Sequence, residues 1–210
     1  LIGGLGVDNQ KHVVIVYGGV SSLDFGSAAR VYWTFKTIGH ENVSILNGGF
    51  KGWKNSGNKV VSGENNLSPA KFKTKLNKKY YASFSEVQKA QKGKGSQCLI
   101  DARPAAFFTG DKKHAKARIP GRLANARNLQ EGNLIDGGFK IKSSSEIKSQ
   151  FGGLEGVEKY KGYISYCNTG HWAATVWFGL SEIAQIPNVK MYDGGMTHWT
   201  YDPKRKVDLG

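Results

Sequence analysis

Cys167 is the residue of this sequence best placed to do covalent chemistry. It follows an aromatic and β-branched run at 162–166 and precedes a short loop with one glycine, Gly170, and then a long apolar stretch of helical period. Loop amides and a helix N-terminus both favour negative charge, so a cysteine between a strand and a helix is expected to have a lowered pKa and to react as a thiolate. The alternative is a buried cysteine that behaves as a small hydrophobic residue.

The composition limits the kinds of protein that this chain can be. Its 210 residues are 39% hydrophobic and 11% aromatic, which suits one large folded domain or two small ones. Two cysteines, Cys98 and Cys167, are too few for a disulfide framework, and together with five histidines they show no metal-ligand spacing. We therefore expect neither a metal nor another cofactor.

The net charge is +14, and the lysines that produce it are scattered along the chain. They do not form a recognition helix or an aromatic-studded sheet, so we expect a solvated surface without a specific nucleic-acid partner. The excess charge also draws small anions toward a cleft. No apolar run is long enough to span a membrane. The chain begins at Leu1 without a visible signal peptide, so a targeting segment has been removed or left out, and cytoplasm and periplasm both stay open. We expect a monomer.

An internal repeat organises the chain. The first half has an apparent strand at 12–17, a helix at 28–38 and a strand at 42–46, and the second half repeats them at 162–166, 173–183 and 188–192. The residues that recur are separated by 146 positions in every pair. These pairs are Asn42 and Asn188, Val43 and Val189, Gly48 and Gly194, Gly49 and Gly195, and Trp53 and Trp199. Two copies of one α/β unit are therefore predicted.

Strand–helix–strand alternation with short connections predicts parallel sheets flanked by helices, with the chemistry at the carboxyl ends of the strands. The second copy opens with a strand at 97–101, preceded by a helix at 83–90. Nothing before Leu1 supplies these elements to the first copy, so we expect that its front is lacking. The domains are then a partial one at 1–62, a linker at 63–81 rich in Gly, Asn and Lys, and a second domain at 82–210.

These features together resemble the tandem-domain rhodanese family, the thiosulfate and 3-mercaptopyruvate sulfurtransferases. The resemblance covers most of the chain. Its motifs are Asp101-Ala102-Arg103 at a strand end, the Cys167 loop, Asp193-Gly194-Gly195 with Trp199, and Ile119-Pro120-Gly121 followed by Asn125 or Asn128. It implies two rhodanese-like α/β domains, of which the second carries the nucleophile. The first is expected to be catalytically silent because Gly18 stands where the second has Cys167. The loop from Gly18 to Ala28 in the first copy is expected to be three residues longer than the matching loop after Cys167. The first copy is also expected to supply one wall of the cleft.

The resemblance implies sulfur transfer through a persulfide on Cys167. The thiolate takes sulfur from a small anionic donor such as thiosulfate and passes it to cyanide or a thiol. The residues expected to bind the substrate or line its site are Asn168, Thr169, Gly170, His171, Trp172, Ala173, Arg103 and Asp101. Backbone amides of the loop stabilise the charged sulfur, and Arg103 is favoured as a partner of the loop or of Asp101. The loop ends without the arginine that a cysteine phosphatase needs for phosphate, which argues against phosphatase chemistry.

The basic residues near Cys167 bear on which donor the site accepts. The loop has His171 as its one basic residue, and Phe107 stands where family members carry a substrate-binding arginine. The other basic candidates are Lys112, Lys113, His114, Arg118 and Arg122. We rank thiosulfate first and 3-mercaptopyruvate as an alternative. A sulfur-carrier or redox-relay module acting on a protein partner, and a scaffold that retains the fold, are the other hypotheses. An active sulfurtransferase predicts a partly exposed Cys167.

Overall fold

Two parallel sheets form the framework of the protein. The computed structural model describes residues 1–65 and 67–210. In the first sheet β1 (Val13–Ile15) pairs with β2 (Val43–Ile45). The second sheet has the order β4-β3-β5-β6 and contains β3 (Gln97–Asp101), β4 (Arg127–Asn128), β5 (Gly162–Tyr166) and β6 (Val189–Met191). All these pairings are parallel, which confirms the predicted α/β class with parallel sheets.

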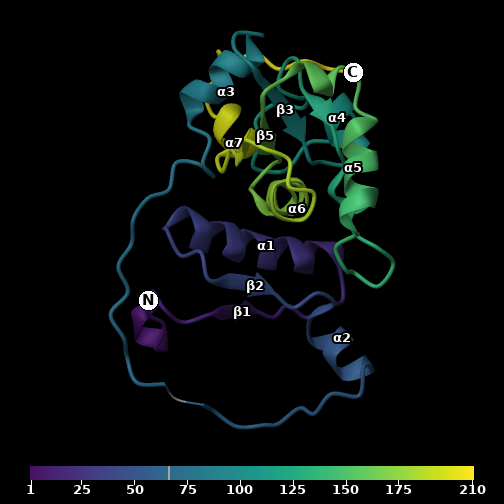
Figure 1. Ribbon diagram of the computed structural model, residues 1–210. Helices are drawn as coiled ribbons and strands as arrows, with labels where there is room; N and C mark the ends of the chain where they lie inside the picture. Colours follow the sequence, from purple (N-terminus) through teal and green to yellow (C-terminus); the bar gives the residue numbers. More distant parts are fainter. Residues whose placement is uncertain (66) are drawn as a thin grey trace.

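Helices follow most strands and flank the sheets (Figure 1). The α-helices are α1 (Ser22–Thr37), α2 (Gly49–Asn55), α3 (Phe84–Gln91), α4 (Ala105–Thr109), α5 (Ser144–Gly152), α6 (His171–Phe178) and α7 (Gly195–Trp199). The short 3₁₀ turns are η1 (Gly3–Leu5), η2 (Glu131–Leu134) and η3 (Val157–Lys159), and η4 (Gly179–Ile183) is a π-helical continuation of α6. Capping boxes start α3 at Ser83 and α5 at Ser143 and so fix where these helices begin.

The first long helix begins earlier than its apolar pattern predicted. Ser21 caps α1, because its hydroxyl accepts a hydrogen bond from the backbone N–H of Asp24. The strand pairings match Tyr17 with Cys167, so four residues precede α1 where three precede α6, and the prediction of three extra residues there is wrong. Most of the difference in length lies in the helices: α1 has 16 residues, whereas α6 and η4 together span 13.

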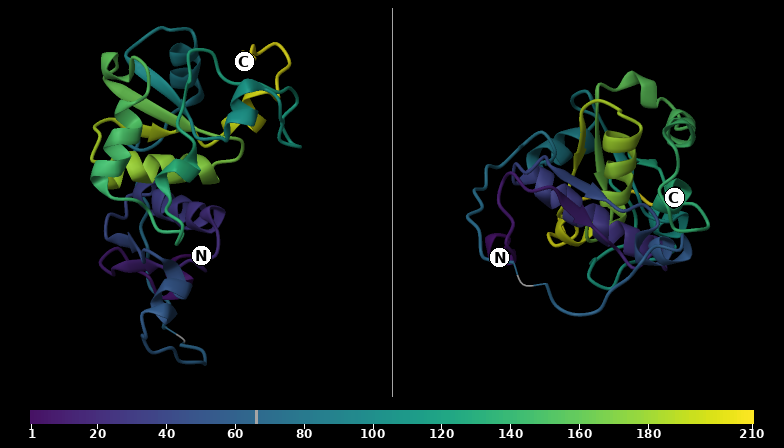
Figure 2. Two further views of the ribbon diagram at one scale, coloured as in Figure 1. Left: turned by 90° about the vertical axis from the view of Figure 1, so that its right-hand side faces the viewer. Right: turned by 60° about the horizontal axis from the view of Figure 1, so that its bottom comes forward.

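The chain between α2 and α3 runs back past the first sheet (Figures 1 and 2). Its backbone bonds to the first unit on the way, since Ala70 donates to Gly3 and Lys75 donates to Ile38. Tyr81 then forms a parallel bridge with Met191 at the edge of the second sheet. This course is that of a connection between two units.

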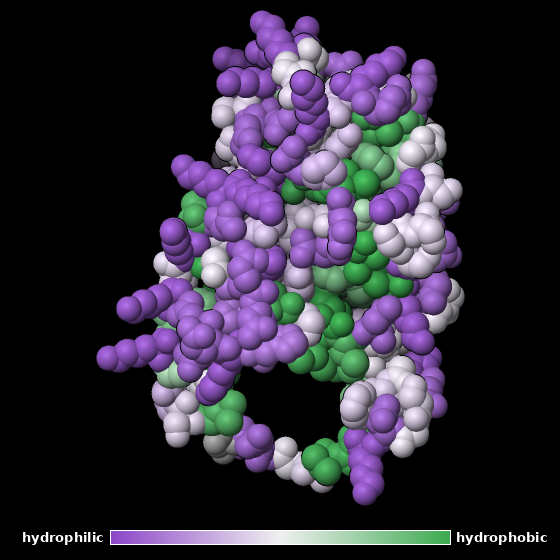
Figure 3. All heavy atoms as spheres, viewed as in Figure 1, coloured by the Kyte–Doolittle hydropathy of each residue, from purple (hydrophilic) through white to green (hydrophobic). Residues whose placement is uncertain are grey.

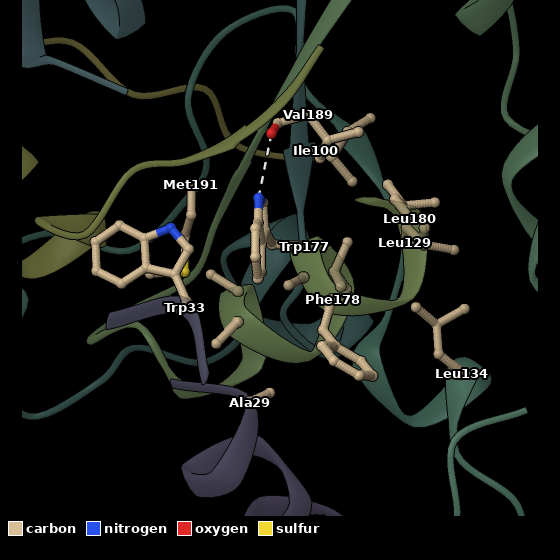
Figure 4. Packing of buried hydrophobic residues seen from close by; sticks show 14 of the residues in the cluster. Ala29, Trp33, Ile100, Leu129, Leu134, Trp177, Phe178, Leu180, Val189 and Met191 are labelled. Atoms are coloured by element: carbon tan, nitrogen blue, oxygen red, sulfur yellow. Dashed lines mark hydrogen bonds between the residues drawn. The ribbon is translucent and has the colours of Figure 1, made fainter. Parts of the chain in front are cut away.

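The largest hydrophobic core joins the two units. The helix α1 lies against α6, with Ala29 and Trp33 on one side and Trp177 and Phe178 on the other (Figure 4). The indole N–H of Trp177 donates to the backbone oxygen of Val189 at 3.1 Å, which ties the helix to β6. A second cluster covers the opposite face of the four-stranded sheet and includes Leu99, Ile164, Tyr166, Met196 and Trp199.

The outer face of the first sheet stays apolar and exposed. Figure 3 shows hydrophobic atoms gathered beside the hollow that the long connection encircles. A groove of about 350 Å³ lies on this face, lined by Val14, Val16, Leu46, Phe50, Trp53, Lys59 and Val60. None of the helices in the described residues is both long and apolar enough to cross a membrane.

Candidate active site

Cys167 lies directly after β5, which has β3 on one side and β6 on the other. The three residues Asn168, Thr169 and Gly170 carry the chain from the end of this strand into α6. Gly170 has a φ of 108°, a backbone conformation that favours glycine. The turn directs the backbone N–H of Gly170 at the Cys167 sulfur, with a nitrogen–sulfur distance of 3.1 Å.

The prediction of a lowered thiol pKa is wrong. Burial raises the pKa of the Cys167 thiol, and this cause outweighs the backbone N–H groups of Ala173, Gly170 and Thr169, which lower it. The negative charge of Asp101 acts in the same direction as burial. The residue is also 1% exposed, so the expected partial exposure is wrong as well. The amides do converge on the sulfur, but they act on a group from which water is almost excluded.

The start of α7 packs directly against the backbone of the Cys167 loop. Gly195 has a φ of 56°, and a Cβ at this position would lie 2.6 Å from the carbonyl oxygen of Cys167 and closer still to that of Asn168. The backbone N–H of Met196 donates to the Cys167 carbonyl at 2.8 Å. The first copy has the same contact, since Phe50 donates to the Tyr17 carbonyl beside Gly49. The repeated glycine pair is therefore explained by close backbone approach.

The first copy of the loop shows how such a turn holds negative charge. The strand pairings of Ile15 with Ile45 and of Ser165 with Met191 make Tyr17, not Gly18 as predicted, the counterpart of Cys167. In the loop that follows, the carboxylate of Asp24 accepts hydrogen bonds from Gly19 N at 2.8 Å and Val20 N at 3.2 Å. A Cβ built on Gly18 would lie 2.7 Å from the same carboxylate oxygen. This loop thus places a carboxylate against its own backbone amides. This arrangement supports an anion-binding role for the matching amides around Cys167.

Asp101 and Arg103 support the loop from behind. The Arg103 guanidinium makes hydrogen bonds to both carboxylate oxygens of Asp101, to the Gly121 carbonyl at 2.8 Å and to the Asn168 side-chain oxygen at 3.4 Å. Both residues are at most 2% exposed. Asn128, rather than Asn125, holds this segment, since its amide donates to the carbonyls of Asp101 and Arg103. The ion pair therefore positions Asn168, and neither of its members lines the pocket.

A pocket of about 220 Å³ opens onto the sulfur. Its lining residues are Leu23, His114, Cys167, Asn168, Thr169, His171 and Trp172. Asn168, Thr169, His171 and Trp172 thus lie where substrate contact was predicted, whereas Gly170 and Ala173 act through their backbones. Phe107 packs edge-on against Trp172, with ring centroids 5.7 Å apart. An aromatic pair therefore stands where members of the family carry a substrate-binding arginine.

Two residues of α1 complete the site and were not predicted. Leu23 lines the pocket, which confirms that the first copy supplies one wall. Arg30 forms an ion pair with Asp193, and its guanidinium lies against Gly170. Neither residue has a signal in the sequence, because both contacts depend on how α1 packs against α6.

The comparisons with known proteins agree with this geometry. The family model described as a rhodanese-like domain matches residues 83–202. The thiosulfate sulfurtransferase of Bos taurus is 32% identical over 203 residues, covering 94% of this chain and 66% of the relative. The 3-mercaptopyruvate sulfurtransferase of Escherichia coli (strain K12) is also 32% identical, over 196 residues, with 93% and 67% covered. This chain thus spans about two thirds of the length of these relatives.

Solved structures give the same fold. A crystal structure of a 3-mercaptopyruvate sulfotransferase from Escherichia coli superposes with a TM-score of 0.78 and 31% identity, covering 91% of this chain and 69% of that one. The wild-type structure of EanB superposes with a TM-score of 0.83, covering all of this chain and 53% of that one. Because its identity is 18%, this second likeness concerns the fold alone.

Proposed function

The chain belongs to the rhodanese family, and from that premise we propose that it is a thiosulfate sulfurtransferase that works through a persulfide on Cys167. The observation that carries the proposal is the Cys167 sulfur itself. It lies at the end of a central strand, accepts a hydrogen bond from Gly170 N at 3.1 Å and opens onto a pocket of about 220 Å³. This is a nucleophile within a ring of amide donors and beside room for a small donor molecule.

The reaction proceeds in two displacements at sulfur. The Cys167 thiolate attacks the outer sulfur of thiosulfate, a sulfur–sulfur bond forms, and the sulfur–sulfur bond of the donor breaks so that sulfite leaves with its electron pair. Cyanide then attacks the outer sulfur of the persulfide, forms a carbon–sulfur bond and leaves as thiocyanate, which returns the thiolate. A thiol acceptor reacts as its thiolate and leaves as a persulfide. In each step the charge of the reactants equals that of the products.

The surroundings of the sulfur suit an anionic donor. Asn168 is 2% exposed and lines the pocket, and its side-chain nitrogen is a buried donor without a partner in the described residues. An oxygen of a bound anion satisfies such a group, whose desolvation is otherwise uncompensated. The carboxylate of Asp24 on the matching amides of the first copy supports the same preference for negative charge.

3-Mercaptopyruvate is the second candidate donor. The Escherichia coli 3-mercaptopyruvate sulfurtransferase has the same identity to this chain, 32%, as the Bos taurus thiosulfate enzyme. Thiosulfate is ranked first because the pocket lining contains no Lys or Arg to grip a carboxylate, as far as the described residues go. Transfer to a protein partner, as in a sulfur carrier, uses the same persulfide.

The test is to incubate the protein with thiosulfate and cyanide, or with 3-mercaptopyruvate and cyanide, and to measure thiocyanate. We expect thiocyanate from thiosulfate and none from the Cys167→Ala variant. Cys98→Ala is the matched control, because Cys98 is equally buried but lies within β3, away from the pocket. A sulfur adduct on Cys167 without thiocyanate would support the carrier hypothesis. Neither product nor adduct with either donor would contradict a sulfurtransferase.

A further inference from the structure

The lining of the Cys167 pocket divides into polar groups and apolar side chains. The loop after β5 contributes Cys167, Asn168 and Thr169, which carry a thiol, an amide and a hydroxyl group. Leu23 and Trp172 contribute aliphatic and aromatic surface, and two imidazoles complete the lining. A molecule that fills this pocket therefore meets polar groups beside the sulfur and apolar side chains elsewhere.

Leu23 reaches the pocket from the first unit. It is the second residue of α1, whereas every other lining residue among those described belongs to the second unit. Leu23 is 51% exposed, although it is a large apolar residue. Because removing apolar surface from water is favourable, an apolar group of a bound molecule gains free energy by covering this side chain.

Contacts on both sides of Leu23 hold its backbone in place. The hydroxyl of Ser22 donates to the carboxylate of Glu131, a buried residue of the second unit, at 2.9 Å. One turn further along α1, a Cβ on Gly26 would lie 3.2 Å from the carbonyl oxygen of His171. The start of α1 is therefore fixed against the Cys167 loop, and Leu23 is presented to the pocket from a defined position.

Trp172 is the second apolar residue of the lining, and it too is supported from outside the pocket. Its ring packs edge-on against Phe107, with ring centroids 5.7 Å apart. It also packs against the large core that joins the two units. Apolar side chains that are held before a ligand arrives lose little freedom on binding, so they can discriminate between ligands by their substituents.

Resting on the proposed function, we propose that Leu23 determines specificity at the substituent end of the donor, and that it favours donors R–SO₂–S⁻ in which R is apolar. The outer sulfur of such a thiosulfonate lies at Cys167, and R lies against Leu23 and Trp172. The Cys167 thiolate forms a sulfur–sulfur bond to the outer sulfur, the sulfur–sulfur bond of the donor breaks, and the sulfinate R–SO₂⁻ leaves with its electron pair. Thiosulfate is the member of this series in which R is O⁻.

The experiment compares two donors that carry the same charge and the same reacting group. Methanethiosulfonate and benzenethiosulfonate differ in the apolar area of R, and kcat/KM for thiocyanate formation with cyanide is measured for each, on the full 210-residue chain. The two sulfinates also differ as leaving groups. The readout is therefore how the ratio of the two kcat/KM values, benzene over methane, changes from one protein to the next.

Four variants are compared with the parent protein. Leu23→Asn keeps a branched side chain but makes it polar, Leu23→Ala shortens it, and Leu23→Met keeps an apolar side chain of similar size. Val31→Asn is the matched control, because Val31 is also exposed on α1 but does not line the pocket. Because Leu23 is half exposed, these changes leave the hydrophobic core intact.

We expect the ratio to fall about tenfold in Leu23→Asn and by a smaller factor in Leu23→Ala, because the ring of the larger donor loses its aliphatic partner. Leu23→Met should keep the ratio within about threefold of the parent value, since it restores apolar surface. Val31→Asn should match the parent. Loss of structure would lower kcat/KM for both donors together, so a selective fall for benzenethiosulfonate is specific to the contact.

A ratio that stays within about twofold of the parent value in both Leu23→Asn and Leu23→Ala, with methanethiosulfonate still turned over, would overturn the inference. An equal fall in Leu23→Met would also overturn it, because apolar surface would then not be what matters. The proposed function fails on a different measurement, namely the absence of thiocyanate and of a sulfur adduct on Cys167 with every donor. That result would remove this inference as well, whereas an unchanged ratio removes the inference alone.

Discussion

At the scale of single residues, the site depends on how burial and amide dipoles compete at the Cys167 sulfur. The sequence predicts the dipoles correctly, because a strand, a three-residue turn and a helix place N–H groups around the side chain. It does not predict that α1 and His114 cover the sulfur from the other side. A charged sulfur loses hydration there, and the loss exceeds what the amides return.

This balance predicts how the free thiol reacts with pH. Because burial raises the pKa of the Cys167 thiol, its alkylation by iodoacetamide should still be accelerating above about pH 8.5, the ordinary cysteine pKa. The measurement is the alkylation rate from pH 6 to pH 10, followed by mass spectrometry of the Cys167 peptide. A rate that reaches its plateau near neutral pH would contradict the direction of the shift.

The control is the second thiol. Burial raises the pKa of Cys98 to about 11, so this residue should contribute little alkylation over the same range. Cys98→Ala protein should therefore give the same profile as the parent, and Cys167→Ala protein should show almost no reaction. Loss of the profile in the Cys98→Ala variant would mean that the wrong sulfur had been followed.

At the scale of elements, each copy of the strand–loop–helix unit holds an acceptor against backbone N–H groups of its loop, and the acceptor differs between the copies. Four residues separate Tyr17 from α1 and three separate its counterpart Cys167 from α6, and both loops are held at their base by a glycine with positive φ, Gly49 or Gly195. In the first loop Asp24 supplies the negative charge, and in the second the Cys167 sulfur does. The first copy has no thiol in this loop, and its amides already hold a carboxylate.

A double-mutant cycle tests this interpretation of the first loop. Gly18→Ala should cost about 1–3 kcal/mol of unfolding free energy, because the new methyl group displaces the Asp24 carboxylate from two backbone N–H groups. Asp24→Ala loses the same hydrogen bonds, so adding Gly18→Ala to it should cost little more. The measurement is urea unfolding of the four proteins, from which the coupling energy is obtained.

Gly4→Ala is the control for the effect of an added methyl group, because a Cβ at Gly4 meets no atom within 4 Å. Costs for Gly18→Ala that are the same with and without Asp24 would mean that the carboxylate does not fill the position of the missing side chain. Gly18 has no positive φ, so backbone strain does not complicate the comparison.

The element scale also shows what the sequence could and could not provide. The strands at 97–101 and 162–166 are found with the predicted bounds, because their apolar runs are buried on both faces. The start of α1 was placed too late, since the apolar pattern begins at Ala28 whereas the cap at Ser21 decides where the helix begins. A comparison of the two loops that ends at the first alanines of the helices therefore counts three more helical residues in the first copy than in the second.

At the scale of the whole molecule, the candidate site is shared between two units whose matching helices pack together. Gly26 of α1 lies so close to α6 that a Cβ there would be 3.2 Å from the carbonyl oxygen of His171. Lys36 and Arg30 form ion pairs across the same boundary with Glu182 and Asp193. No pattern within either copy predicts these contacts, because they arise only when the helices are placed face to face.

This sharing predicts that a charge on the first unit tunes a group in the second. Because the positive charge of Arg30 disfavours the His171 imidazolium, Arg30→Gln should raise the pKa of His171, while burial keeps it below the ordinary value. The measurement is the pH dependence of the His171 ring proton signals by NMR, in the parent protein and in the variant. Lys148→Gln removes an exposed charge on α5 and should leave the titration unchanged. A His171 pKa that falls or stays the same in Arg30→Gln would mean that α1 does not set the electrostatics of the Cys167 loop.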